Sequence, residues 1–270
     1  MELIDGIGKE EYFGYSIYRV NYLSDDIKGV IRNRLVSICH GEVNNDPSID
    51  IFSYKETIKA FLERYSENDD NRKKGMIGEL LVHVIFEIEG EFVKASPFFN
   101  LEEKSFKKGY DITLISKLSN ELWITEIKSG EKQKKQKTAS EAMIRLLGKA
   151  KNDLKTRLSE NDGSLWRNAI HAARASMEES STQKQMAIKI LGRYSNDATQ
   201  GRASSGNHNV ILAGMLFHSM SEKMEEEKIR NAYINIVDED IFCNVCIVAI
   251  QKEAFYTVYS FLESEVCDEV

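Results

Sequence analysis

Apolar residues recur at helical spacing in several parts of the chain. The i, i+3, i+4, i+7 pattern runs through residues 54–66 and again through 76–87, and it predicts an amphipathic helix in each segment. The polar residues 71–74 indicate a break between these two helices. Further helices are predicted over residues 138–158, 165–177, 221–233 and 252–264.

Short apolar runs bounded by polar residues predict the strands. Residues 110–118 and 122–128 are two such runs, and the turn residues Ser119-Asn120-Glu121 between them are typical of a hairpin. Residues 209–218 and 242–250 are apolar and short enough to be buried strands. Residues 91–97 and residues 12–22 also look extended. The pattern does not predict where the segment 12–22 lies in the fold.

The order of these elements predicts the fold class. A helix, a hairpin, and then helices and further strands are typical of an α/β domain with a mixed central sheet flanked by helices, with additional helical elements. Ser, Thr, Gln, Gly and Asn collect in residues 178–209, which indicates a long loop interrupted by a short helix. We expect a single domain over residues 1–270, with a core of about 54–160 plus strands of about 209–250, and a polar helical segment of about 161–208.

The composition is that of an ordinary folded protein, with 42% apolar and 29% charged residues. No run approaches the roughly 20 apolar residues of a membrane span, and the N-terminal residues lack the basic flank of a secretory signal. Cys243 and Cys246 lie three residues apart in an apolar run, so on a strand they point to opposite faces. We expect buried structural thiols rather than a metal or redox pair, a cytoplasmic location, and no membrane partner.

The charge of the chain is uneven. Its net charge of −7 at pH 7 argues against a generally basic nucleic-acid surface. Residues 128–157 nevertheless hold ten basic side chains against three acidic ones, whereas residues 221–240 hold seven acidic side chains against three basic ones. A mostly acidic chain with one basic segment suits a protein that meets a polyanion at one place. The charge pattern alone fits a solvated helical face equally well.

Three charged residues are embedded in the apolar runs of the predicted hairpin, namely Asp111, Glu126 and Lys128. Buried charges are usually paired or bound to a metal ion, because a lone buried ion is costly. Glu126 and Lys128 lie two residues apart and therefore on one face of a strand, while the hairpin brings Asp111 toward Glu126. Two carboxylates and a backbone carbonyl suit Mg²⁺. An ordinary ion pair between Glu126 and Lys128 is the alternative.

This arrangement resembles the PD-(D/E)xK nuclease superfamily, with Asp111, fourteen intervening residues, and then Glu126-Ile127-Lys128. Tyr110 stands where the superfamily name has proline. The resemblance implies a restriction-endonuclease-like sheet and hydrolysis of phosphodiesters with Mg²⁺, or Mn²⁺, held by Asp111, Glu126 and the Ile127 carbonyl. Lys128 would orient or help deprotonate the attacking water.

The superfamily's upstream helix often carries a further acid, and Glu79 in Gly78-Glu79-Leu80-Leu81 fits that position. The resemblance therefore gives Glu79 an auxiliary role at the metal, direct or through water. Lysines downstream of the motif would hold flanking phosphates of a nucleic acid and make its binding salt-dependent. These lysines are Lys132, Lys134, Lys135, Lys137 and Lys149.

The layout of the whole chain is similar to that of the HamA family, the nuclease subunits of the Hachiman anti-phage defence system. The likeness lies in residues 78–81, 105–111 and 123–128, and in the late strand segment 211–214. It implies a superfamily 2 helicase, HamB, as the partner that restrains the nuclease. It also implies broad degradation of DNA without a sequence-specific reader.

Two alternatives stay open. One is a stand-alone restriction or repair nuclease of the same superfamily, and the other is a catalytically inactive nuclease fold that serves as a nucleic-acid-binding or assembly module. ATP hydrolysis and zinc-dependent hydrolysis have little support, because the sequence contains neither a GxxxxGK(S/T) phosphate loop nor an HExxH pair.

Overall fold

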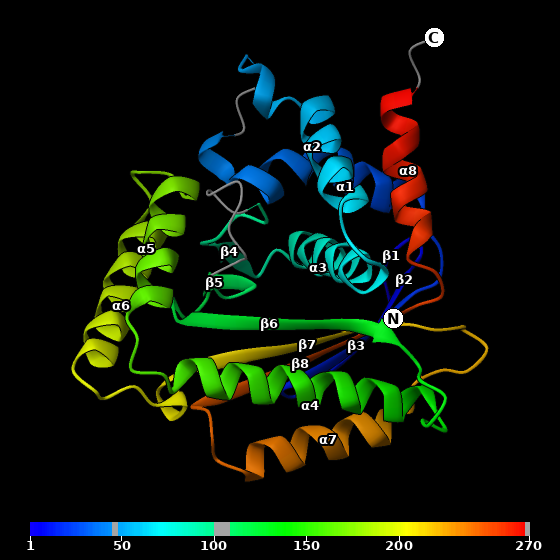
Figure 1. Cartoon of the computed structure of the whole chain (residues 1–270). Helices are drawn as coiled ribbons and strands as arrows, with labels where there is room; N and C mark the ends of the chain where they lie inside the picture. Colours follow the sequence, from blue (N-terminus) through cyan, green and yellow to red (C-terminus); the bar gives the residue numbers. More distant parts are fainter. Residues whose placement is uncertain (45–47, 100–108, 268–270) are drawn as a thin grey trace.

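The apolar strand segments assemble into one mixed sheet. Residues 1–44, 48–99 and 109–267 are described by the computed structural model, and within them eight strands lie in the order β1-β2-β3-β8-β7-β6-β5-β4 (Figure 1). These strands are β1 (Glu2–Ile4), β2 (Ile7–Tyr12), β3 (Tyr15–Val20), β4 (Phe92–Lys94), β5 (Ile112–Ser116), β6 (Leu122–Glu131), β7 (Asn209–Phe217) and β8 (Asn244–Lys252).

β6 is the strand at which two kinds of pairing meet. On one side it pairs with β5 in the antiparallel sense, and on the other side it pairs with β7 in parallel. β4 continues the antiparallel part, whereas β8 and β3 continue the parallel part before the β1–β2–β3 meander ends the sheet. The mixed sheet and the hairpin of β5 and β6 are therefore confirmed.

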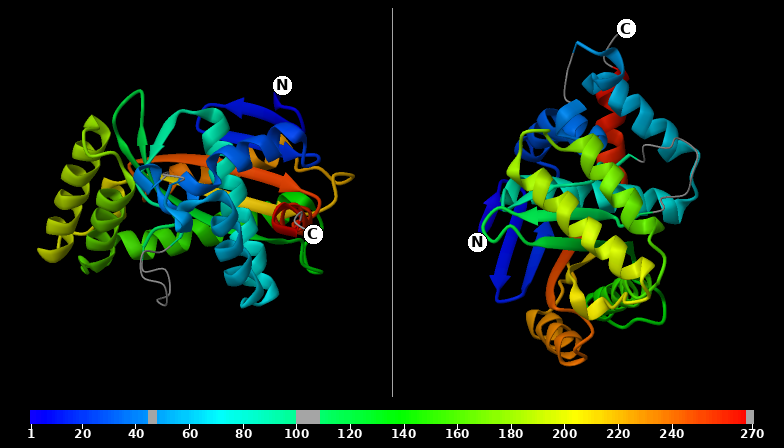
Figure 2. Two further views of the ribbon diagram at one scale, coloured as in Figure 1. Left: turned by 90° about the horizontal axis from the view of Figure 1, so that it is seen from above. Right: turned by 90° about the vertical axis from the view of Figure 1, so that its left-hand side faces the viewer.

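Helices cover both faces of this sheet (Figure 1). α3, with α1, α2 and α8 beyond it, lies on one face, and α4 and α7 lie on the other. α5 and α6 pack side by side at one end of the sheet (Figure 2). None of the helices in the described residues is long and apolar enough to cross a membrane. The helices are α1 (Asp25–His40), α2 (Tyr54–Ser66), α3 (Asp70–Glu89), α4 (Ala139–Leu158), α5 (Ser164–Ser176), α6 (Thr182–Thr199), α7 (Glu226–Asp238) and α8 (Tyr256–Cys267), with single 3-10 turns at Glu42–Asn44, Asp50–Phe52 and Ser205–Asn207.

Side chains along β6 alternate between two apolar cores. Ile127 packs into the core beneath α3, and Ile124 packs into the core beneath α4. Glu126 and Lys128 are an even number of residues from Ile124, so they face α4. The position of α4 over β6 therefore decides the surroundings of both charged residues.

A capping side chain marks the start of α3. The Asp69 carboxylate accepts a hydrogen bond from the Arg72 amide at 2.9 Å, and α3 begins at Asp70. The predicted break over residues 71–74 is wrong, because these polar residues, exposed or half-buried, form the first turn of α3. The helix predicted over residues 54–66 is confirmed as α2.

The segment 178–209 is mostly helical, so the predicted long loop with a short helix is wrong. α6 fills Thr182–Thr199, and the Ser181 side chain caps it by accepting a hydrogen bond from the Lys184 amide at 3.1 Å. Only a narrow stripe of this helix is buried, including Ala187 and Leu191, and its contacts are chiefly with α5. The mostly polar composition therefore led to an underestimate of the length of a helix that needs few apolar residues.

The structure gives the patch 12–22 its place in the sheet and changes two other expectations. The extended patch 12–22 is mainly β3, which pairs in parallel with β8. The acidic helix α7 begins at Glu226, five residues after the predicted start. Cys243 is exposed and precedes β8, so the expectation that it is buried is wrong, whereas burial raises the pKa of Cys246 to about 12.

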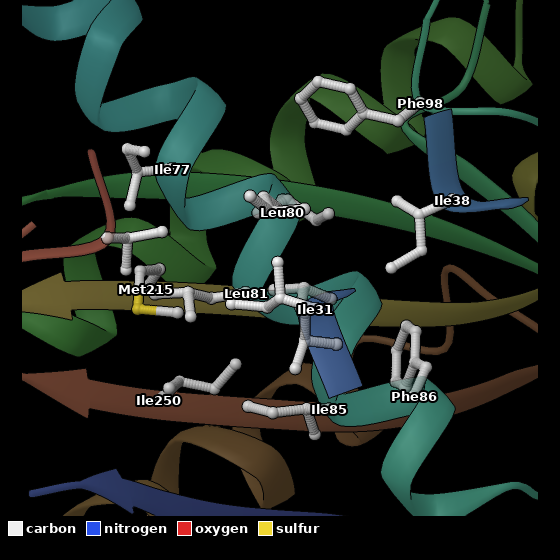
Figure 3. Packing of buried hydrophobic residues seen from close by; sticks show 14 of the residues in the cluster. Ile31, Ile38, Ile77, Leu80, Leu81, Ile85, Phe86, Phe98, Met215 and Ile250 are labelled. Carbon is white, nitrogen blue, oxygen red and sulfur yellow. The ribbon is translucent and has the colours of Figure 1, made fainter. Parts of the chain in front are cut away.

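A glycine allows α3 to lie close to the sheet. In the core beneath α3, Leu81 packs near Met215 of β7 (Figure 3). A Cβ atom at Gly78 would lie 1.9 Å from Ser129 Oγ of β6 and 3.2 Å from Met215 Cγ. Gly78 therefore sets the separation of α3 from β6.

We predict that Gly78→Ala lowers the free energy of unfolding by about 1–3 kcal/mol, because the new methyl group must push α3 or Ser129 aside. Urea unfolding measures the change. Gly75→Ala in the same helix is the control: nothing lies within 4 Å of its added Cβ, so it should stabilise by up to about 1 kcal/mol. A Gly78→Ala loss that Ser129→Gly does not reduce would contradict the proposed contact.

His208, at the start of β7, gives the fold a pH dependence. Its ring is stacked on Trp166 at 5.0 Å and meets Tyr194 at 4.2 Å, and burial lowers its pKa to about 4. When the pH is below 6.5, the ordinary pKa of histidine, this residue binds a proton in the unfolded chain that the folded chain excludes. The free energy of unfolding therefore falls as the pH is lowered from about 6.5 to about 4, by up to about 3 kcal/mol.

We predict that His208→Phe removes this part of the acid destabilisation, because phenylalanine keeps the stacked ring and binds no proton. Urea unfolding at about pH 7 and about pH 4.5 measures it. His171→Gln alters an exposed histidine and should retain the slope of the unmodified chain. Equal pH slopes for His208→Phe and the unmodified chain would refute the assignment.

Candidate active site

The candidate residues lie where β5 separates from β6. Pairing of the two strands ends at Ile112 opposite Thr125, and extending that register by one residue sets Asp111 opposite Glu126. Asp111 Oδ2 accepts a hydrogen bond from the Ile127 amide at 2.7 Å. The Asp111 carboxylate therefore lies beside the backbone of β6, next to the residue that separates Glu126 from Lys128.

Glu126 is a buried acid that is neutralised by two cations. Only 3% of its side-chain surface is exposed. Lys128 Nζ donates to Oε1 of this carboxylate at 2.8 Å, and Arg157 Nη2 pairs with Oε2. A buried carboxylate without such partners would cost several kcal/mol, so the two ion pairs are what allow an acid in the middle of the sheet.

α4 supplies two charged residues that the sequence analysis did not assign to the site. Besides its pair with Glu126, Arg157 donates to the Gly109 carbonyl at 2.9 Å. Asp153 Oδ2 lies 2.7 Å from Lys128 Nζ. Asp153 and Arg157 are four residues apart at the edge of the buried face of α4, and oppositely charged residues at that spacing are the signal that could have located them.

Glu79 lies on the other side of the sheet from Glu126. It belongs to α3, which covers the face opposite to α4. Burial raises the pKa of the Cys39 thiol in α1, and the charge of Glu79 adds to that rise, so Glu79 acts electrostatically on the α1 side of α3. The structure thus brings together Asp111, Glu126 and Lys128, and the auxiliary role of Glu79 stays a prediction.

The lysines expected to bind phosphate lie at the carboxyl end of β6 and on α4. One of them is already engaged, because Lys132 Nζ lies 2.7 Å from Glu222 Oε2. Hydrogen bonds from Lys132 and His218 lower the pKa of Glu222 to about 2, so this acid stays ionised. The other four lysines are exposed to solvent: Lys134, Lys135, Lys137 and Lys149.

The ligand atoms around Asp111 fit a hard divalent cation such as Mg²⁺ or Mn²⁺. The amide and carbonyl of one strand residue point to the same neighbouring strand, and the Ile127 amide points to Asp111. The Ile127 carbonyl therefore faces the same side, and with the carboxylates of Asp111 and Glu126 it makes an all-oxygen set. Among the described residues, no group of three or more His, Cys, Asp or Glu side chains is placed to hold a metal ion, so a site here depends on the carbonyl and on water.

Comparison with known proteins identifies the family. A search among curated proteins gave no match. The family model named HamA matches residues 5–262, a span that begins after β1, includes Asp111, Glu126 and Lys128, and ends within α8. Because this match covers nearly the whole chain, the protein belongs to the HamA family, and its membership supports a role as a component of the Hachiman anti-phage defence system.

Proposed function

We propose that this protein is a Mg²⁺-dependent nuclease that cleaves DNA. The observation that carries the proposal is the convergence of Asp111, Glu126 and Lys128 at the point where β5 leaves β6. Two acids and an amine held by neighbouring strands are the groups that metal-assisted phosphodiester hydrolysis requires. Their spacing along the chain is the one that resembles the PD-(D/E)xK superfamily.

In this mechanism Mg²⁺, or Mn²⁺, when bound would polarise the phosphate and acidify a coordinated water. The carboxylates of Asp111 and Glu126 and the carbonyl of Ile127 would hold the ion. Lys128 Nζ, 2.8 Å from Glu126 Oε1, is held beside the same carboxylate. From there the amine would orient the attacking water or balance the negative charge that grows on the phosphate.

The charge of the chain favours a partner protein that brings the nuclease to DNA. A net charge of −7 weakens unaided binding to a polyanion, and three of the exposed lysines, Lys134, Lys135 and Lys137, lie close together in the segment after β6. We therefore propose that the nuclease is the effector of an anti-phage complex with a superfamily 2 helicase of the HamB kind. A stand-alone restriction or repair nuclease would instead cut DNA efficiently in the absence of any helicase.

One observation favours a second candidate, a catalytically inactive nuclease fold that binds nucleic acid or assembles a complex. Both oxygens of Glu126 already contact cations, as they would in a purely structural ion-pair cluster. A structural cluster predicts no cleavage with any divalent ion. The same cleavage experiment therefore separates the two candidates.

We predict that Glu126→Gln reduces Mg²⁺-dependent plasmid cleavage to background and that Lys128→Ala lowers its rate by about 10²–10⁴-fold. Both variants should fold, because Lys128 and Arg157 keep 28% and 24% of their side chains exposed and stay hydrated. Cleavage is followed on plasmid and single-stranded DNA over a Mg²⁺ and Mn²⁺ titration, with and without a candidate helicase.

Glu87→Gln is the matched control for Glu126→Gln. Glu87 in α3 also contacts one arginine and one lysine, Arg34 and Lys94, but it lies outside the candidate site. This control should lose stability and still cleave DNA. Wild-type cleavage by both Glu126→Gln and Lys128→Ala would show that the site is assigned wrongly.

We predict that replacing both Lys134 and Lys135 with alanine weakens DNA binding and flattens its salt dependence. Each lost phosphate contact lowers the slope of log K against log salt by about 0.9, so the pair should lower it by about 2. Fluorescence anisotropy with labelled DNA at several salt concentrations measures the slope. The control replaces Lys59 and Lys189, exposed lysines of α2 and α6, and an equal effect there would refute a local binding surface.

A further inference from the structure

Arg157 contacts both segments that carry the proposed metal ligands. Its Nη1 atom donates to the Gly109 carbonyl at 2.9 Å, and its Nη2 atom pairs with the carboxylate of Glu126. Gly109 lies two residues before Asp111, in the segment that leads into β5. One guanidinium therefore spans the gap between this segment and the middle of β6.

An aromatic ring gives the same guanidinium a third contact. Arg157 Cζ lies 5.5 Å from the centre of the Tyr110 ring, and Tyr110 is held in turn against Trp166 at 4.8 Å. The cation, the carbonyl and the ring thus bind the segment at two consecutive residues, 109 and 110. A lysine could not reproduce this, because its ammonium is a single point charge without a planar fork.

The spacing of charged residues along α4 places Arg157 opposite Glu126 of β6. Asp153 and Arg157 are four residues apart, a rise of about 6 Å along a helix. Glu126 and Lys128 are two residues apart, about 6.6 Å along a strand. The two spacings match, so Asp153 meets Lys128 at 2.7 Å while Arg157 meets Glu126, and the four charges alternate in sign.

We propose that Arg157 is a positioning residue of the candidate nuclease site. It holds the Gly109–Asp111 segment against β6, so that the carboxylates of Asp111 and Glu126 stay close enough to share one divalent ion. This inference rests on the proposed function. The contacts of Arg157 with Gly109 and Tyr110 do not involve Glu126, and they therefore keep the guanidinium in place when the carboxylate turns toward a metal.

The test compares Arg157→Lys with the unmodified protein in two measurements. Calorimetric titration with Mn²⁺ alone, without DNA, reports metal affinity, and plasmid cleavage over a Mg²⁺ series reports the half-saturating concentration separately from the maximal rate. We expect Arg157→Lys to weaken Mn²⁺ binding and raise the half-saturating Mg²⁺ concentration by about 10-fold or more. Added guanidinium should restore part of both to Arg157→Ala, whose shortened side chain leaves room for it.

Arg34→Lys is the matched control. Arg34 in α1 also bridges two segments, because it pairs with Glu87 of α3 and with Glu42 after α1. Its loss should change the thermal unfolding temperature without changing Mn²⁺ affinity or Mg²⁺ dependence. If Arg157→Lys fails to fold, the guanidinium rescue of Arg157→Ala decides the question.

The outcomes separate the positioning role of Arg157 from the proposed nuclease function on which it rests. If the unmodified protein binds Mn²⁺ and cleaves DNA while Arg157→Lys binds Mn²⁺ equally or more tightly, the positioning role is overturned and the nuclease assignment stands. Tighter binding would identify Arg157 as a competitor of the metal for Glu126. If the unmodified protein neither binds Mn²⁺ nor cleaves DNA, both proposals are overturned.

Discussion

The burial of one carboxylate, that of Glu126, is the constraint on which the candidate site depends. An acid with only 3% of its side chain exposed must have its charge balanced nearby, and both of its oxygens contact cations. Lys128 comes from the same strand, but Arg157 comes from α4, thirty-one residues later in the chain. α4, the first of the helices between β6 and β7, therefore also supplies one of the two balancing charges.

The end of the β5 pairing gives the site its second acid. β6 continues along β7 to Glu131, whereas its pairing with β5 extends only to Ile112 opposite Thr125. Beyond that point the Asp111 side chain, rather than a backbone carbonyl, accepts the hydrogen bond of the Ile127 amide. Because the strands diverge here, a carboxylate can enter the plane of the sheet without leaving the amide unsatisfied.

Local patterns were sufficient to predict the hairpin of β5 and β6, its two acids Asp111 and Glu126, and most helices. That Glu126 and Lys128 point to the same face of β6 follows from strand geometry alone. The contacts of Arg157 could not be predicted in this way, because they depend on the register of α4 against β6, which is a long-range property. α6 was predicted too short for a different reason, since its narrow buried stripe leaves a polar composition that is also typical of loops.

Close contacts on both faces of the sheet fix the charged residues of β6 in place. On the α3 side, Gly78 lies against Ser129 with no room for a methyl group. On the α4 side, Gly214 of β7 is in register with Lys128, and a Cβ atom there would lie 2.2 Å from Met143 Sδ of α4. Neither helix can move relative to β6 without losing packing. Because rigid elements hold functional groups more accurately than loops do, these contacts favour a well-defined geometry for the charged residues in the middle of β6.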